Sequence, residues 1–200
     1  VPHWKARFDL SALKEFDAPR LSEGTRYPQE FIMWMYISTN QLDKAEAQYR
    51  ALSDERQQAN INLEERSIML TMQGACEEAI EMLDRAHEGQ LRIYGMVDPN
   101  MNRSNSQLAL NRAYCLRQLG RDSEAADIIA RVGEYVDTLR ENAEWGFAQL
   151  ETKLLILEGE PEKALDVLEQ AMERFELRWS VRYDPIISTL SNHPRYQALF

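Results

Sequence analysis

The sequence has few of the features that mark disulfide-stapled or membrane-spanning proteins. Only two of its 200 residues are cysteine, Cys76 and Cys115, and no Cys-x-x-Cys spacing occurs, which excludes a disulfide scaffold. Both fall among apolar residues of predicted helices, so we interpret them as buried thiols, with a bridge between neighbouring helices as the alternative. The longest apolar stretch, residues 31–37, is far short of the roughly 18 residues that span a bilayer. We therefore predict no membrane span in this region.

Positive charge is also scarce. The chain carries 23 Lys and Arg against 33 Asp and Glu, a net charge of −10. Wrapping a phosphate backbone requires clustered Lys and Arg, so nucleic acid is not an expected partner of this region. A basic partner, or simply a solvated acidic surface, fits the charge balance. The chain begins with Val1 and its first 20 residues lack the apolar core of a signal peptide, which suggests a region taken from a longer protein.

Motifs for catalysis and metal binding are missing as well. His3, His87 and His193 are far apart, and the sequence contains no His-x-x-x-His spacing, phosphate-cradling glycine loop or nucleophile turn. Adjacent acids such as Glu64 and Glu65 point about 100° apart on a helix, so they cannot share a substrate. We predict a non-enzymatic protein with no cofactor. An enzyme built from residues scattered over the fold is the alternative.

A pattern of small and apolar residues recurs four times along the chain. Each copy has an alanine, a large apolar residue four places later, and a small or apolar residue seven places later, all on one face of a helix. The first two copies are 34 residues apart, which is the period of a helix–turn–helix solenoid repeat. The copies are Ala45–Tyr49–Leu52, Ala79–Leu83–Ala86, Ala125–Ile129–Val132 and Ala164–Leu168–Ala171.

Helical periodicity and turn residues predict an all-α chain. We expect helical hairpins at about 28–54, 60–94, 106–140 and 142–177, preceded by a capping segment at 1–27 and followed by capping helices at 178–200. The predicted hairpin turns lie at Asn40-Gln41, Gln73-Gly74, Gly120 and 158–161. Residues 95–105 are predicted to form the one long loop, and Asn142 to cap the fourth hairpin. Asp184-Pro185 and Asn192-His193-Pro194 are each predicted to start a short helix against the last hairpin.

These residues resemble the tetratricopeptide repeat family, and the third copy carries the likeness best, with Ala109, Ala113, Leu116, Gly120, Ala125, Ile129 and Val132. The resemblance implies a right-handed α–α superhelix of about four hairpins that binds other proteins. Arg66, Arg112 and Glu151 depart from the family pattern, because a leucine is usual at their positions.

The end of the chain carries a second resemblance. Arg178-Trp179, Tyr183-Asp184-Pro185 and the segment 193–199 are similar to a common ending of bacterial tetratricopeptide regions. Such endings follow winged-helix domains of membrane-anchored transcriptional regulators, and also cyclase or kinase domains. The resemblance implies a sensing or partner-binding region of a larger bacterial regulator. Its location would be periplasmic if the regulator is membrane-anchored and cytoplasmic otherwise.

The resemblance also implies where a partner binds, since the first helices of such hairpins line a concave groove. Trp34, Ile68 and Tyr114 are predicted to form an apolar ladder there, and Arg117 and Lys153 to accept a carboxylate or an acidic peptide side chain. Packing of these apolar residues against the N-terminal segment is the alternative. The expected partner is a protein or peptide; self-association, as a dimerisation module of a signalling protein such as a cyclase or kinase, is the second functional hypothesis. The predicted groove residues are Tyr27, Trp34, Ile68, Leu110, Tyr114, Arg117 and Lys153.

Overall fold

The computed structural model describes residues 29–52, 57, 60–90, 103–142, 144, 146–174, 181 and 183–200. All regular structure in these ranges is helical and they contain no strand, which confirms the all-α prediction. The predicted N-terminal cap, with Tyr27, and residues 95–102 of the predicted loop lie outside the described residues. The longer helices are α3 (Gln29–Ser38), α4 (Leu42–Arg50), α6 (Asn60–Met72), α7 (Cys76–Gln90), α8 (Arg103–Gln118), α9 (Asp122–Glu141), α10 (Ala148–Glu158) and α11 (Pro161–Glu173).

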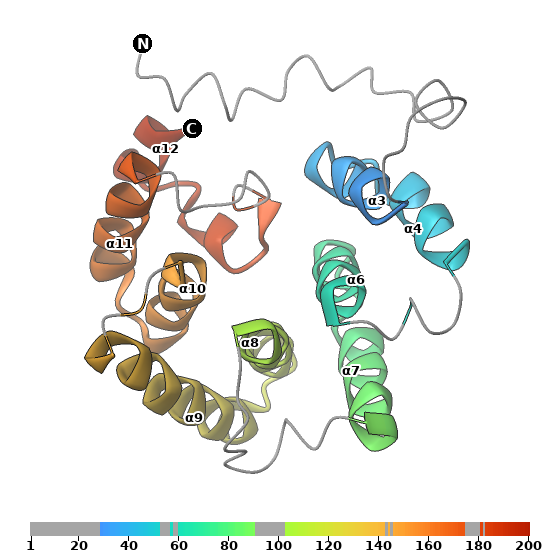
Figure 1. Cartoon of the computed structure of the whole chain (residues 1–200), viewed down its shortest axis with the longest axis horizontal. Coiled ribbons are helices and arrows are strands. Elements are labelled where there is room, and N and C mark those ends of the chain that lie inside the picture. Colours follow the sequence, from blue (N-terminus) through green and yellow to red (C-terminus); the bar gives the residue numbers. More distant parts are fainter. Residues whose placement is uncertain are drawn as a thin grey trace.

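The helices pack in consecutive pairs, α3 with α4, α6 with α7, α8 with α9 and α10 with α11. Figure 1 shows α3, α6, α8 and α10 on the inside of a curved row, which we call the inner arc, and α4, α7, α9 and α11 outside it. Neighbouring inner helices contact each other, α3 with α6, α6 with α8, and α8 with α10. Helices α6 and α8 run in the same direction, because Ser67 contacts Asn111 and, four residues further along both helices, Thr71 contacts Cys115.

The same turn joins the two helices of every pair. In each turn one residue has a left-handed backbone: Asn40 with φ 58°, Gly74 with 75°, Gly120 with 72° and Gly159 with 82°. In every turn the residue that follows donates its N–H to the carbonyl five residues earlier. The N···O distance is 2.9 Å in the turn between α8 and α9 and 2.8 Å in the other three turns. This hydrogen bond and the left-handed residue define a Schellman motif, which favours glycine because a side chain crowds the backbone there. The predicted turn positions are confirmed.

The four-fold pattern of small residues forms the buried stripe that its spacing predicts. The four alanines that begin the copies are fully buried, with an exposed fraction of 0%: Ala45, Ala79, Ala125 and Ala164. Each therefore lies inside the packed interior and not at the surface. The apolar residues four and seven places later are also buried wherever their side chains are described; the side chain of Ala86 is not. These stripes contribute to three apolar clusters along the row, centred on α3, α4 and α6, on α6 to α10, and on α10, α11 and the tail.

Two predicted boundaries in the second half of the chain are wrong. Helix α8 begins at Arg103, so residues 103–105 belong to it rather than to the predicted loop. Asn142 does not start the fourth pair; it follows the last residue of α9 as its C-cap, and α10 begins only at Ala148. The N–H of Asn142 still bonds to the carbonyl of Thr138 at 3.1 Å, which continues the hydrogen-bond pattern of α9. An asparagine is common at both ends of helices, so its identity alone did not decide between them.

The tail forms two short helical segments, the 3-10 helix η3 (Ile187–Leu190) and α12 (Pro194–Leu199). His193 caps α12 as predicted: its Nδ1 accepts the N–H of Arg195 at 3.2 Å, and its Nε2 lies 3.0 Å from Glu162 Oε1. Because Nδ1 accepts, Nε2 carries the proton and donates to the carboxylate. Arg195 makes a bidentate contact with Glu169 on α11: its Nε donates to Oε1 at 2.9 Å and its Nη2 to Oε2 at 2.7 Å. Helix α12 thus covers the exposed end of the last pair.

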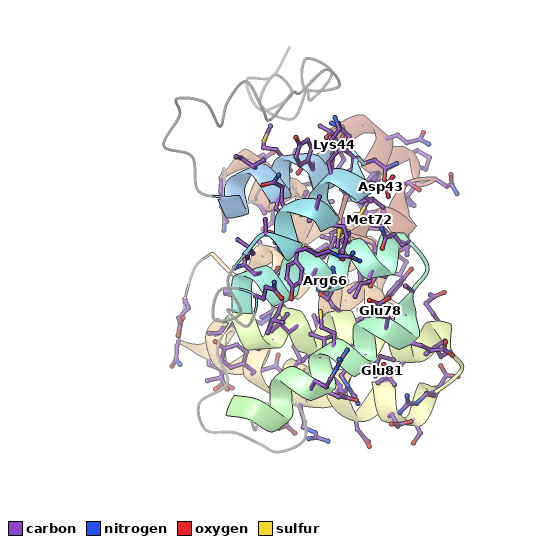
Figure 2. The ribbon with its side chains drawn as sticks, turned by 90° about the vertical axis from the view of Figure 1, so that its right-hand side faces the viewer. Asp43, Lys44, Arg66, Met72, Glu78 and Glu81 are labelled. Carbon is purple, nitrogen blue, oxygen red and sulfur yellow. The ribbon has the colours of Figure 1, made fainter. Side chains whose placement is uncertain are left out.

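The three charged residues that depart from the family pattern hold neighbouring pairs together. Arg66 on α6 forms ion pairs with Glu46 on α4 and with Glu78 on α7, on the side shown in Figure 2. Arg112 on α8 pairs with Asp84 on α7 at 2.8 Å. Glu151 on α10 pairs with Arg140 on α9 at 2.7 Å. Each of these three charged side chains therefore joins an inner helix to the outer helix of the preceding pair.

Introducing a leucine, the residue usual in the tetratricopeptide pattern, at one of these positions tests what the ion pairs contribute. In Arg112→Leu we expect an unfolding free energy within about 1 kcal/mol of wild type, because the apolar side chain packs and Asp84, which is half exposed, returns to water. Arg112→Ala should cost more, since it also removes the packing of the arginine stem. Urea unfolding of both variants measures this. A loss of several kcal/mol in Arg112→Leu would show that the charge itself stabilises the fold.

Candidate functional site

Buried polar side chains in the described structure gather on one side of the molecule. They come from the inner helices and the facing tail, and within the described ranges the outer helices contribute none. Burying polar groups costs free energy unless they are paired, so such a concentration points to specific recognition or to a structural network. The residues are Ser38, Asn62, Glu64, Glu65, Ser67, Ser106, Asn111, Thr152, Lys153 and Asp184.

Four of these residues form a continuous line of two hydrogen bonds and one ion pair across the inner arc, which we call the polar chain: Ser67, Asn111, Lys153 and Asp184. Asn111 Nδ2 donates to Ser67 Oγ at 2.8 Å, and Lys153 Nζ donates to Asn111 Oδ1 at 2.6 Å. Lys153 Nζ lies 2.9 Å from Asp184 Oδ2. The line starts on α6, crosses α8 and α10, and ends on the tail.

The ion pair at the end of this line is sealed from solvent, with exposed side-chain fractions of 0% for Lys153 and 1% for Asp184. Asp184 Oδ2 meets no donor at a good hydrogen-bond angle, so at 2.9 Å the attraction between the two charges dominates the contact. Asp184 Oδ1 accepts the N–H groups of Ile186 at 2.9 Å and Ile187 at 3.3 Å. The carboxylate therefore fixes the tail to α10 and shapes the tail's own turn.

The tail segment 183–190 consequently occupies part of the inner side of the row (Figure 1). Its 3-10 helix packs on α10. Ile186 is fully buried in the apolar cluster built by α6 to α10, whereas Ile187 belongs to the cluster of α10, α11 and the tail. One charge and two adjacent isoleucines thus hold an irregular stretch of polypeptide against the inner helices.

The structure separates the predicted groove residues into buried and accessible ones. Ile68 and Leu110 are buried in apolar clusters, and Lys153 is wholly enclosed. Their side chains are therefore not available to a partner laid on the described surface. Lys153 does hold a carboxylate as predicted, but the carboxylate is that of Asp184 in the same chain. Trp34 lies in α3, and its side chain, like residue Tyr27, lies outside the described residues.

Tyr114 and Arg117 remain accessible to a partner. Tyr114 is half-buried on α8, and burial, together with the nearby thiols of Cys76 and Cys115, raises the pKa of its phenol, so the hydroxyl stays neutral at physiological pH. Arg117, near the end of α8, is exposed and donates one guanidinium N–H to the carbonyl of Leu157 on α10. That hydrogen bond orients the guanidinium, and an arginine has five N–H donors in total.

The residues that sequence reasoning missed are Ser67, Asn111 and Asp184. The sequence predicts Asp184 only as the start of a short helix, and no pattern described above gives Ser67 a role. The available signal for Asn111 was a polar residue one place after the apolar Leu110 and two places before Ala113 on a predicted helix. Its partners lie 44 and 42 residues away, and no local periodicity encodes such distances.

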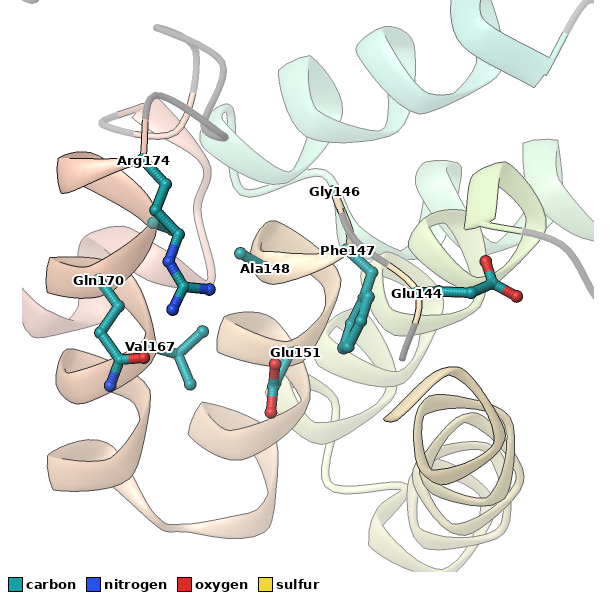
Figure 3. Close-up of a pocket in the computed structure, with 9 residues that line it drawn as sticks. Glu144, Gly146, Phe147, Ala148, Glu151, Val167, Gln170 and Arg174 are labelled. Atoms are coloured by element: carbon teal, nitrogen blue, oxygen red, sulfur yellow. The ribbon is translucent and has the colours of Figure 1, made fainter. Parts of the chain in front are cut away.

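A cavity of about 210 Å³ opens on the other side of α10. In Figure 3, Val167 and Gln170 from α11 and Arg174, the C-cap of α11, lie opposite Ala148 and Glu151 of α10. Phe147, which precedes α10, also lines the cavity. Glu151 already pairs with Arg140. Ligand pockets usually measure about 300–1,000 Å³, so this cavity is sized for a single side chain and not for a substrate.

Comparison of the chain with family models, with curated proteins and with solved structures finds no match. Within the described residues, no helix combines the length and apolarity needed to cross a membrane. The same part of the chain brings no three His, Cys, Asp or Glu side chains together as metal ligands. The site is therefore characterised by the geometry of the inner arc alone.

Proposed function

We propose that this protein is a non-enzymatic binding or sensing module of the tetratricopeptide type that presents its inner arc to a protein or peptide. The four equivalent turns and the four buried alanines support a repeated helical hairpin as the building unit. The tail resemblance supports a role within a larger bacterial transcriptional regulator. The proposal concerns recognition and assigns no reaction to the chain.

One observation carries the proposal: the inner helices already hold a short segment of polypeptide that consists of a turn and a single 3-10 helix. Lys153 and Asn111 supply the polar anchor for Asp184, and the helices bury Ile186 beside it. A charged anchor that fixes register, with apolar pockets next to it, is how helical grooves recognise peptides. A partner would meet the rest of the arc, where Tyr114 and Arg117 offer an aromatic face and a cation.

The experiment places a photo-crosslinking amino acid at position 117 or, as control, at Ala130, which is exposed on the outer helix α9. Expressed in the native bacterium within its full-length protein, the variant at position 117 should capture a protein that the control does not. The captured segment is then synthesised as a peptide and its Kd is measured by calorimetry.

For that peptide, the double variant Tyr114→Ala/Arg117→Ala should bind at least about tenfold more weakly, since aromatic and arginine anchors dominate such interfaces. Arg50→Ala, which removes an exposed arginine of the outer helix α4, should bind like wild type. Equal capture from both positions, or unchanged affinity in the double variant with helicity intact, would contradict the proposal. Capture of a second copy, with a dimer by light scattering, would instead favour the self-association hypothesis.

A further inference from the structure

Cys76 and Cys115 lie together in the core, although 39 residues separate them and they belong to different helical pairs. Cys76 is the first residue of α7, directly after the turn that closes α6, and Cys115 is on α8. Both side chains are buried, both are free thiols, and both belong to the apolar cluster of α6 to α10. The second and third pairs therefore meet at their two cysteines.

The local geometry places the two thiols close to each other. Cys115 Sγ lies 3.3 Å from the hydroxyl oxygen of Thr71, in the last turn of α6. The N–H of Ala75 returns to the carbonyl of Leu70 at 2.8 Å, which positions the start of α7 beside that hydroxyl. Besides burial, the nearby Cys76 thiol raises the pKa of Cys115. Thr71, Cys76 and Cys115 thus form a compact cluster that three helices hold in place.

We propose that Cys76 and Cys115 form a disulfide bond that locks the second helical pair to the third when the protein meets a disulfide oxidant. Buried thiols that lie close together on two packed helices need only a small displacement to reach bonding distance. The oxidant is a small-molecule or protein disulfide, such as oxidised glutathione. This inference is independent of the proposed binding function.

The chemistry proceeds by two exchange steps. The thiolate of Cys76, the less deeply buried of the two residues, attacks one sulfur of the oxidant, the S–S bond of the oxidant breaks, and one thiol leaves. The Cys115 thiolate then attacks Cys76 Sγ of the mixed disulfide and releases the second thiol. Two cysteine thiols are oxidised, one disulfide is reduced to two thiols, and the two protons end on the released thiols.

The second step is slow, because burial raises the pKa of Cys115 to about 12 and little thiolate is present near neutral pH. The hydrogen bond from Thr71 acts in the opposite direction and favours the thiolate. Exchange should therefore speed up with rising pH. In Thr71→Val the closure rate should fall while the final extent of bridging stays the same, which separates assistance by the hydroxyl from mere proximity.

The test treats the reduced, folded protein overnight with oxidised glutathione, then denatures it, alkylates the remaining thiols and measures the intact mass. We expect a loss of two hydrogens, no alkylation, and a Cys76–Cys115 cross-linked peptide after proteolysis. Cys76→Ala and Cys115→Ala are the controls; they should give no intramolecular bridge. A parallel sample is refolded from denaturant with the same oxidant, so that slow access to the buried thiols does not hide the bond.

The bridged protein should keep the helicity of the reduced form and melt roughly 5–10 °C higher, since the bond closes a long loop of the unfolded chain. Two free thiols in both samples would overturn the proposal. So would a bridge that forms only on refolding and lowers helicity or melting temperature, because it would show that the native fold does not accommodate the bond.

Discussion

Replacing Lys153 by alanine is expected to lower the unfolding free energy by about 3–5 kcal/mol, because it leaves the carboxylate of Asp184 buried without its counter-charge. Asn111 loses its donor at 2.6 Å in the same variant, so the polar chain is broken at its centre. A domain is usually stable by only about 5–15 kcal/mol in total. The loss should therefore appear in urea unfolding followed by circular dichroism, and as a melting temperature lower by roughly 10 °C.

A double-mutant cycle separates the charge pair from the packing of the lysine stem. Lys153→Met keeps the length of the side chain and Asp184→Asn keeps an oxygen to accept the N–H groups of Ile186 and Ile187. Each single variant leaves one buried charge alone, whereas the double variant leaves none. We expect the double variant to lose less than half of the summed single losses.

The control for this cycle is Lys163→Met on α11, where the lysine is mostly exposed and pairs with Glu160 within its own helical turn. Its effect should stay within about 0.5 kcal/mol of wild type. If the losses of unfolding free energy in the two single variants simply add in the double variant, the two charges do not stabilise each other. The tail would then be held by its isoleucines alone.

The difference between the two lysines also shows how far sequence reasoning reached. The resemblance to the tetratricopeptide pattern implied that Lys153 lies on an inner helix and binds a carboxylate of a partner, and the Asp-Pro pair at 184–185 predicted a cap. The cap agrees with the structure, since Asp184 Oδ1 does accept two N–H groups of its own turn. Lys153 does bind a carboxylate, but it is buried and its carboxylate belongs to the same chain and not to a partner. The other oxygen of Asp184, Oδ2, pairs with Lys153 only because the tail folds back against α10. No spacing in the sequence predicts that fold-back.

The charged residues at leucine positions illustrate the same limit. Arg66, Arg112 and Glu151 looked like defects in the repeat, because the pattern describes each hairpin by itself. In the structure each is paired with an outer helix of the preceding hairpin. Repeat patterns encode the contacts inside one hairpin well, since those recur at fixed offsets. Contacts between hairpins depend on the offset from one copy to the next, which varies along this chain.

The contacts inside a hairpin, by contrast, follow directly from the sequence. Among these contacts, we expect substitutions at the four buried alanines of the pattern to have the largest effect on stability. Ala125 on α9 is 0% exposed within the central apolar cluster, whereas its neighbour Ala126 is exposed. A protein interior is packed as densely as an organic crystal, so there is no volume for three additional carbon atoms at position 125. Ala125→Leu should cost about 3 kcal/mol, or force the second helix of the third pair to move away from its neighbours.

Ala126→Leu is the matched control, because it makes the same substitution one residue later on the same helix, where solvent leaves room. Leucine and alanine have similar helix propensities, so this variant should unfold within about 0.5 kcal/mol of wild type. Urea unfolding of the two variants side by side gives the comparison. Equal losses would indicate that the helix as a whole, and not its buried face, is sensitive to the substitution. No loss in Ala125→Leu would show that the pair is packed loosely enough to fold without a small residue at this recurring position.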